Sequence, residues 1–319
     1  MISTDIQFAD VAQAVEEGFS KQPKRLPSWL FYDETGDKIF QEIMRMPEYY
    51  LTACEHEILQ MQKDKLLKYF FQSGTQFNLV ELGAGDGFKT EVLLKHFLKE
   101  RTDFEYSPVD VSSNVLAQLS ERLILTLPEL VVKPINKNYF EAIDEMNDDE
   151  IRKVFLFLGA NIGNMIASEA SHFTRKIGKA MKRGDLLMIG FDLKKDPRLI
   201  QAAYDDAHGI TRSFNLNLLV RLNRELGAQF LLDQFSHYPF YNPESGLASS
   251  YLISKLDQNV YFEACDKYVH FDRWEMIHTE VSQKYDLEMI ESLADASGLT
   301  VVEVFYDCKH YFCDVLMRR

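Results

Sequence analysis

The chain has 319 residues, 46% of them hydrophobic and 13% aromatic, enough for one large domain or two modest ones with a substantial core. Its 49 acidic and 35 basic residues give a net charge of −14, which disfavours a nucleic-acid substrate because such a field repels phosphate backbones. Met1 to Phe8 lack the pattern of a signal peptide and no apolar run reaches the roughly 18 residues that span a membrane, so we expect a cytoplasmic protein without membrane contacts.

Before residue 77, apolar residues recur at helical intervals in three segments, and aromatic residues cluster between them. The expected helices span 8–20, 37–46 and 53–71. The aromatic clusters are Trp29-Leu30-Phe31-Tyr32-Asp33 and Pro47-Glu48-Tyr49-Tyr50. We therefore expect a helical N-terminal part.

From residue 77 onwards, five short apolar runs alternate with segments of helical periodicity. The apolar runs are Phe77–Leu82, Glu105–Val111, Leu130–Ile135, Val154–Leu158 and Leu186–Phe191. The helical segments between them are 88–99, 114–125 and 166–182. Short apolar runs are typical of strands buried on both faces, and their alternation with helices predicts a parallel, doubly wound sheet.

The expected boundary of this region is Lys194-Lys195-Asp196-Pro197. Residues 198–232 have helical periodicity, interrupted at His208-Gly209, and the strand-like runs Ser250–Lys255 and Asn259–Cys265 follow.

The chain closes with a helix at 286–296 and two strands, Thr300–Tyr306 and Tyr311–Leu316, joined by a short turn. This hairpin, added to five βα units, gives seven strands. We therefore predict an α/β fold with a doubly wound, Rossmann-like seven-stranded sheet and a second, α+β domain.

A glycine-rich turn, Gly83-Ala84-Gly85-Asp86-Gly87, follows the first strand and precedes a helix that starts near Lys89. Such a turn needs glycine because a Cβ would block the dihedral angle or the approach of a ligand. Phe88 stands where the dinucleotide pattern G-x-G-x-x-G requires its last small residue, which makes a nicotinamide cofactor less favoured. A glycine turn without any cofactor stays open as an alternative.

Two acids end the first two strands, Glu81 and Asp110. A carboxylate at the end of the second strand can accept two hydrogen bonds from a ribose diol, as adenosine offers. An acidic loop also suits a sulfonium and an amino group better than a pyrophosphate. The turn therefore favours S-adenosylmethionine as cofactor.

The four cysteines are scattered, which favours free thiols in a reducing compartment. Cys308 and Cys313, with His310 between them, could be metal ligands, but no second pair completes a four-ligand set, and we expect no metal. The other two are Cys54 and Cys265.

Six separated motifs lie along nearly the whole chain. They are Trp29–Gly36, Met46–Thr52, the glycine turn with Lys89-Thr90, Phe157–Asn164, Ala203–Thr211 with Phe214-Asn215, and Thr279–Lys284. In this order they resemble the histidine-specific Nα-methyltransferases, whose best-understood members trimethylate histidine to hercynine in ergothioneine biosynthesis. The resemblance implies an S-adenosylmethionine-binding domain of residues 60–194 and 285–319, and a substrate-binding domain of residues 1–59 and 195–284.

The resemblance also implies roles for individual residues. Those expected at the cofactor are Gly83, Gly85, Lys89, Asp110, Tyr139 and Phe140. Family members usually carry an acid before the residue that corresponds to Phe140, whereas this chain has Tyr139. Tyr50 would close over the cofactor and approach the substrate amine, as the catalytic residue.

On the same resemblance, Asn164 and Tyr204 would bind the substrate carboxylate, while Glu280 and Ser282 would hold the imidazole. Glu280 and Ser282 are two residues apart, so in a strand they share a face. Each residue has a simpler alternative: a helix N-cap for Asn164, core packing for Tyr204, and a solvated or salt-bridged acid for Glu280.

One stretch departs from the family, because Ala248-Ser249-Ser250 replaces the Ile-Glu-Met of members that use histidine. Histidine is the leading substrate, with another amino acid or a small amine as the alternative. A binding protein without catalysis also stays open. We expect a monomer that transfers a methyl group in line to a neutral α-amine, with catalysis mostly by positioning.

Overall fold

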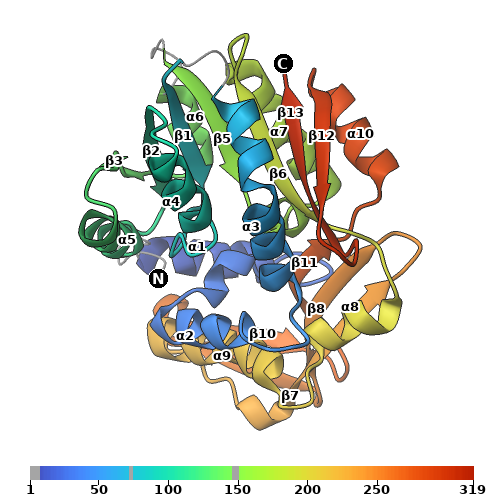
Figure 1. Ribbon diagram of the computed structural model, residues 1–319. Coiled ribbons are helices and arrows are strands. Elements are labelled where there is room, and N and C mark those ends of the chain that lie inside the picture. The colour runs from blue at the N-terminus through green and yellow to red at the C-terminus, as the bar shows by residue number, and fades with distance from the viewer. Residues whose placement is uncertain (1–7, 72–74, 146–150) are drawn as a thin grey trace. The chain divides into compact units, whose positions relative to one another are not determined.

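The computed structural model describes residues 8–71, 75–145 and 151–319 (Figure 1). Two compact units make up the chain. The sheet unit is Leu51–Lys194 with Gln283–Arg319, and the insertion unit is the described residues up to Tyr50 with Lys195–Ser282. The sequence placed the boundaries at 59/60, 194/195 and 284/285. The assignment of a cofactor to one unit and a substrate to the other stays a prediction.

Within the described ranges, no helix is both long enough and apolar enough to cross a membrane. The residues on which the expectation about a signal peptide rests, Met1 to Gln7, lie outside these ranges.

One sheet runs through the sheet unit in the order β12-β13-β6-β5-β1-β2-β3, with β4 also paired to β2. Its strands are β1 (Phe77–Leu82), β2 (Phe104–Asp110), β3 (Val131–Val132), β4 (Ile135–Asn136), β5 (Arg152–Phe157), β6 (Leu186–Asp192), β12 (Thr300–Tyr306) and β13 (Phe312–Arg318). Neighbours from β3 to β6 are parallel, whereas β13 is antiparallel to both β6 and β12. Later strands are added on both sides of β1, with β2 on one side and β5 on the other. This order confirms the doubly wound, Rossmann-like sheet.

The third predicted strand, Leu130–Ile135, consists of two short pieces, β3 and β4, which both pair with β2. Pro134 lies between them and has no N–H to donate to the ladder, which explains the break. With β3 and β4 counted as one position, the sheet has the seven expected positions.

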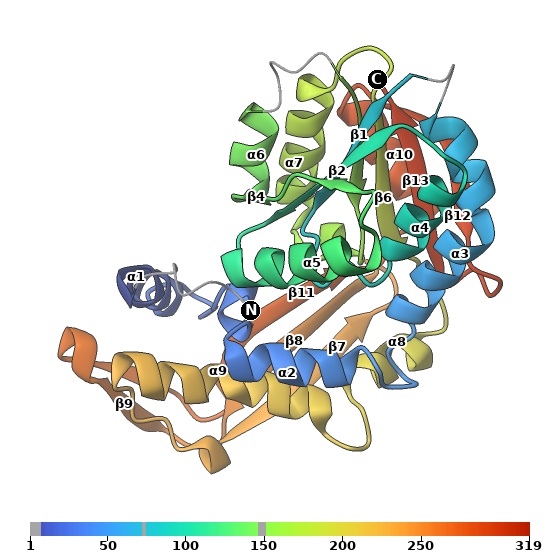
Figure 2. The ribbon, with the colours of Figure 1, turned by 60° about the vertical axis from the view of Figure 1, so that its left-hand side comes forward.

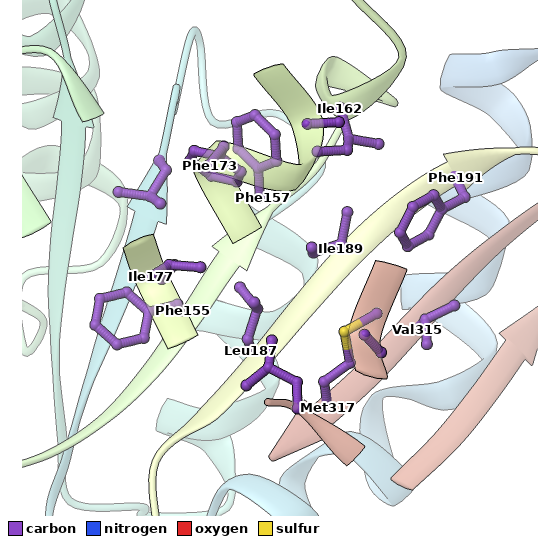
Figure 3. Packing of buried hydrophobic residues seen from close by; sticks show 14 of the residues in the cluster. Phe155, Phe157, Ile162, Phe173, Ile177, Leu187, Ile189, Phe191, Val315 and Met317 are labelled. Carbon is purple, nitrogen blue, oxygen red and sulfur yellow. The ribbon is translucent and has the colours of Figure 1, made fainter. Parts of the chain in front are cut away.

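Helices cover both faces of this sheet, with α6 and α7 on one side and α3 and α4 on the other (Figure 2). The helices are α3 (Leu51–Phe70), α4 (Glu91–Lys99), α5 (Ser113–Thr126), α6 (Tyr139–Glu145), α7 (Ala167–Ala180) and α10 (Leu287–Ala296), with a short 3-10 turn, η4 (Asn161–Asn164). On the α7 side, Phe157, Ile189 and Val315 of three strands pack with Phe173 and Ile177 (Figure 3). Burial of such side chains contributes about 1.5–3 kcal/mol each.

The opposite face of the sheet carries acids. Because alternate residues of a strand face opposite sides, Glu81 of β1, Gly190 of β6 and Asp314 of β13 face the side of α3 and α4. Asp314 lies directly opposite Gly190 in the pairing of β13 with β6. Both Glu81 and Asp314 are buried, so this face needs partners for its carboxyl groups.

Two small antiparallel sheets and four α-helices form the insertion unit. The sheets are β11-β8-β7 and β10-β9, built from β7 (Phe235–Asn242), β8 (Leu247–Ser254), β9 (Gln258–Phe262), β10 (Lys267–Phe271) and β11 (Met276–Gln283). The helices are α1 (Phe8–Phe19), α2 (Glu34–Ile43), α8 (Pro197–Tyr204) and α9 (Ile210–Leu226), with three 3-10 turns, η1 (Ser28–Phe31), η5 (Leu232–Gln234) and η6 (Glu263–Cys265).

The helix predicted over 198–232 is α8 and α9, and the expected interruption at His208-Gly209 separates them. Its predicted end was wrong by six residues, because Gly227 takes a left-handed conformation, φ 58°, and stops α9 at Leu226. Sequence analysis missed β7, β10, β11 and the short helix α6.

A fully buried ion pair fixes the segment that follows β11. Lys284 Nζ lies 2.7 Å from Asp192 Oδ2, and neither side chain is exposed. The adjacent backbone is tied to β6, since Tyr285 N donates to Asp192 O over 2.8 Å. A neighbouring ion pair, Lys194 Nζ to Asp286 Oδ2 at 2.8 Å, is partly exposed.

Replacing Lys284 with Met should lower the free energy of unfolding by about 3–5 kcal/mol, because the Asp192 carboxylate would be buried without its countercharge. Adding Asp192→Asn should restore part of the loss, since the buried charge then disappears. Denaturant unfolding of the single and double variants measures both effects.

The matched control is Lys194→Met, whose partly exposed pair should cost at most about 1 kcal/mol. Equal losses for Lys284→Met and Lys194→Met would contradict the prediction.

Candidate active site

The glycine turn after β1 has the backbone that its sequence predicts. Gly83 and Gly85 have φ values of 77° and 54°, in the left-handed region that favours glycine. A Cβ on Gly83 would lie 3.0 Å from the Tyr139 hydroxyl, whereas one on Gly85 would meet nothing within 4 Å. The turn is anchored where Gly83 N donates to Val109 O over 2.8 Å, so it is held against the end of β2.

Asp110 ends β2 and is bonded to this turn. Its Oδ2 accepts from Gly85 N over 3.1 Å, and its Oδ1 accepts from Ser112 N over 2.9 Å. A carboxylate has about four acceptor sites, so both oxygens keep a lone pair for a further donor such as a ribose hydroxyl. Asp110 and the turn therefore form one unit that fits an adenosine ligand.

Tyr139 and Phe140 begin α6, and their side chains take different surroundings. The Tyr139 ring packs on Phe157 with centroids 5.4 Å apart, and its hydroxyl reaches Gly83. Burial and the charge of Asp110 raise the pKa of Tyr139 to about 12, so it is a neutral donor. The Phe140 ring lies instead against His172, with centroids 5.6 Å apart.

Lys89 is paired with a residue that sequence analysis did not single out. Its Nζ forms an ion pair with Oε2 of Glu55, a residue of α3 with no exposed surface. Burial lowers the pKa of Lys89, but the charge and the hydrogen bond of Glu55, together with the other acids nearby, outweigh this and raise it. Glu55 also accepts from Gly159 N, over 2.7 Å to Oε1 and 3.0 Å to Oε2. One carboxylate thus joins the helix that precedes β1 to the turns that follow β1 and β5.

A sequence signal for Glu55 exists. It lies at helical spacing with Leu51, Ile58 and Leu59, all buried, so it interrupts an apolar stripe with an acid. Asp314 has a similar signal, because it stands among buried apolar residues of β13. A charged group in an apolar pattern predicts a buried partner.

The turn after β5 contains Asn161 and Asn164. Asn161 Nδ2 donates to Leu158 O over 2.8 Å and lies 3.6 Å from the position of a Cβ on Gly83 or on Gly159. Asn164 is exposed at the end of η4. The N-cap of α7 is Ile166, so the alternative role of Asn164 as a helix cap is excluded.

In the insertion unit, Tyr50 and Tyr204 belong to one aromatic cluster with Tyr241. Tyr50 Oη accepts from Lys195 Nζ over 2.9 Å, and this Nζ also lies 4.3 Å from the centre of the Tyr50 ring. Tyr204 is 8% exposed, so it contributes to the core as the simpler interpretation requires.

Glu280 and Ser282 lie on β11. Glu280 is half-buried and its Oε2 accepts from Ser250 Oγ over 3.0 Å. Ser282 is buried. The alternative of a fully solvated Glu280 is therefore wrong, and Ser250, from the stretch that departs from the family, is its direct neighbour.

Buried hydroxyls surround this pair. Thr279 Oγ1 donates either to Asn215 Oδ1, at 2.9 Å, or to Ser250 O, at 3.0 Å. Thr279, Asn215 and Ser250 are all buried. The bonds of Thr279 therefore fix β11, which carries Glu280, next to β8, which carries Ser250.

None of the four cysteines, which all lie in the described ranges, forms a disulfide. Over the described ranges, the groups of three or more potential metal ligands are Glu57-Asp307-Cys308 and Asp257-His270-Asp272. Neither contains Cys313 or His310, which the sequence placed beside Cys308. Cys313 is buried in β13, and His310 stacks on Tyr306 with ring centroids 4.5 Å apart.

Glu81 is a further buried acid below the glycine turn. Its carboxylate accepts from Thr90 Oγ1 over 2.5 Å and from the Tyr106 hydroxyl. Burial raises the pKa of Glu81 from 4.5 to about 7, and these two hydrogen bonds only partly oppose the rise. The folded chain therefore binds a proton here that the unfolded chain has already lost above pH 4.5.

Stability should fall as the pH rises from 4.5 through about 7, because the folded pKa of Glu81 lies above the unfolded one. Glu81→Gln removes the titrating group, so the fall in the free energy of unfolding across this pH range should be smaller by about 3 kcal/mol. Urea unfolding of both chains across this pH range measures the difference. Asp86→Asn, in an exposed position of the same turn, is the control. Parallel curves for the parent chain and Glu81→Gln would refute the prediction.

The amino-acid sequence is similar to those of several known proteins. Residues 11–319 match the family described as histidine-specific methyltransferase, SAM-dependent. The chain is 33% identical over 285 residues to a histidine N-alpha-methyltransferase of Mycobacterium tuberculosis, covering 89% of this chain and 87% of that one. It is 33% identical over 296 residues to the protein of that name from Mycolicibacterium smegmatis, covering 92% and 91%. It is 27% identical to an L-tryptophan methyltransferase of Psilocybe serbica, covering 96% and 92%. The chain therefore belongs to the family of histidine-specific, S-adenosylmethionine-dependent methyltransferases, and the predicted enzyme class and cofactor are confirmed.

Proposed function

We propose that this enzyme methylates the α-amino group of free L-histidine. The observation that carries the proposal is the half-buried Glu280 carboxylate, held by Ser250 and followed two residues later by Ser282. A carboxylate accepts from an imidazole N–H, and a hydroxyl can donate to the other ring nitrogen. Relatives named histidine N-alpha-methyltransferase at 33% identity support the same substrate.

The cofactor residues proposed are those at the carboxyl ends of β1, β2 and β5. Asp110 supplies acceptors for the ribose, and the open side of Gly85 leaves room for a ligand close to the backbone. Tyr139, a half-buried neutral hydroxyl, replaces the acid that the family usually carries near the adenine. Lys89 supplies the positive charge of the proposed cofactor site. The full set of proposed cofactor residues is Gly83, Gly85, Lys89, Asp110, Tyr139 and Phe140.

The amine must be neutral when it reacts, because its lone pair attacks the methyl carbon. S-adenosylmethionine supplies that methyl group as an electrophile. The Lys195 ammonium beside Tyr50 disfavours a second positive charge, so it would lower the pKa of an amine bound there. Tyr50 is the proposed catalytic residue, and its hydroxyl, which accepts from Lys195, would guide the amine proton to water.

Asn164 and Tyr204 are the residues proposed for the substrate carboxylate, through an amide N–H and a phenolic O–H. Asn164 suits the role because it is exposed and does not cap a helix. These residue roles, the cytoplasmic location and the monomeric state stay predictions.

Purified enzyme incubated with S-adenosylmethionine and L-histidine should yield histidine carrying one to three additional methyl groups, measured by mass spectrometry. Histamine, which lacks the carboxylate, and L-tryptophan should react poorly in parallel incubations. Methylated tryptophan without methylated histidine would overturn the substrate assignment. S-adenosylhomocysteine binding without a methylated product from an amino-acid panel would overturn catalysis.

Glu280→Gln should raise the KM for histidine about tenfold, because a charge-assisted hydrogen bond becomes a neutral one. The amide oxygen still accepts from Ser250, so β8 and β11 stay paired. The dissociation constant of S-adenosylhomocysteine, measured by calorimetry, should not change.

Glu244→Gln, in the exposed turn between β7 and β8, is the matched loss of charge and should leave the histidine KM unaltered. A histidine KM unchanged by Glu280→Gln would remove Glu280 from the substrate site.

A further inference from the structure

A second carboxyl group stands beside Glu55. Asp314 of β13 and Glu55 of α3 both have no exposed surface, and they lie on the same face of the sheet. Gly190, opposite Asp314 on β6, makes the space for this arrangement: a Cβ there would come within 2.3 Å of Glu55 Oε1. The chain therefore brings two buried acids together where only one ammonium group, that of Lys89, pairs with them among the described side chains.

The described hydrogen-bond donors in this cluster go to Glu55 and not to Asp314. Glu55 receives Lys89 Nζ and Gly159 N. Among the described residues, no group donates a hydrogen bond to either oxygen of Asp314. An ionised Asp314 would thus be a buried charge with no donor, next to another negative charge, which is prohibitively costly. Burial first, and the charge of Glu55 second, raise the pKa of Asp314 well above its usual range.

We propose that Glu55 and Asp314 hold one proton between them, with Asp314 as the protonated donor to Glu55, and that this pair positions Lys89 and the Gly159 turn for the cofactor. The proton is placed so that the single negative charge stays on Glu55. That charge then fixes two segments, since Lys89 Nζ also lies 3.2 Å from the position of a Cβ on Gly159. Glu55 and Asp314 are positioning residues, and they act through Lys89 and the backbone.

This inference rests on the cofactor part of the proposed function and not on the identity of the amino-acid substrate. It predicts different effects for two isosteric substitutions, Asp314→Asn and Glu55→Gln, each of which replaces a buried acid with its amide. Asp314→Asn keeps a donor toward Glu55, because the amide N–H replaces the carboxyl O–H. Glu55→Gln removes the negative charge that pairs with Lys89.

The first experiment measures S-adenosylhomocysteine binding by calorimetry on the full chain. Asp314→Asn should bind within about twofold of the parent, and Glu55→Gln should bind about tenfold more weakly, as expected when a charge-assisted contact is lost. The KM for S-adenosylmethionine should rise in Glu55→Gln while the KM for the amino acid stays constant, a split that a general loss of stability would not produce.

The matched control is Glu303→Gln, which removes an acid that pairs with Lys65 of the same helix, α3, at a more exposed position. It should leave S-adenosylhomocysteine binding unchanged. Weaker binding in Asp314→Asn, by about tenfold, would overturn the proposal, and this arm decides alone if Glu55→Gln fails to fold.

The second experiment locates the proton directly. The infrared spectrum of the parent chain at neutral pH should contain a carboxylic acid C=O band that is missing from Asp314→Asn. Absence of a band that depends on Asp314 would also overturn the proposal. Neither the calorimetric binding measurement nor the infrared measurement needs methyl transfer, so a failed histidine assay and a failed proton assignment remain distinguishable.

Discussion

The buried carboxylate of Glu55 joins the turns at the edge of the sheet where we propose that the cofactor binds. An ion of this kind must be paired and hydrogen-bonded where water cannot reach it, so its partners are fixed as strictly as the ion itself. Its partners are Lys89 in the segment after β1 and the backbone of Gly159 after β5. β6 contributes only by the missing side chain of Gly190, which leaves the carboxylate its space.

This constraint matters because of where it lies. In open α/β sheets, ligands bind outside the carboxyl ends of the strands, at the point where the strand order reverses. Here that point is the neighbourhood of β1 and β5, which are adjacent in the sheet and carry the two turns that Glu55 connects. Asp110 adds the third strand end through its bond to Gly85. The loops are thus tied to one another before a ligand arrives, which reduces the ordering cost of binding.

The sequence predicted the sheet because its main strands are short, mainly apolar runs that alternate with helices. It placed the glycine turn after β1 and Asp110 at the end of β2, where the structure has them, and their role at the cofactor stays a prediction. It missed β7, β10 and β11, since strands with one solvated face carry polar residues that resemble loops. The boundary predicted at 59/60 cuts through α3, a continuous helix. Glu55 was missed for another reason: its partner Gly159 lies 104 residues away, and a charge in an apolar stripe gains meaning only beside its partner.

A departure from the family pattern lies next to Glu280. Ser250 stands where the resemblance implies a methionine, and its hydroxyl donates to Glu280. A carboxylate offers about four acceptor sites, and the bond from Ser250 uses one of them. The wall at Ser250 is polar, however, where a thioether would have packed against the ring. Recognition of histidine by this chain would therefore depend on the acceptor geometry of Glu280 more than on apolar contact. An indole, with one N–H and a larger apolar surface, would lose more from that exchange than an imidazole does.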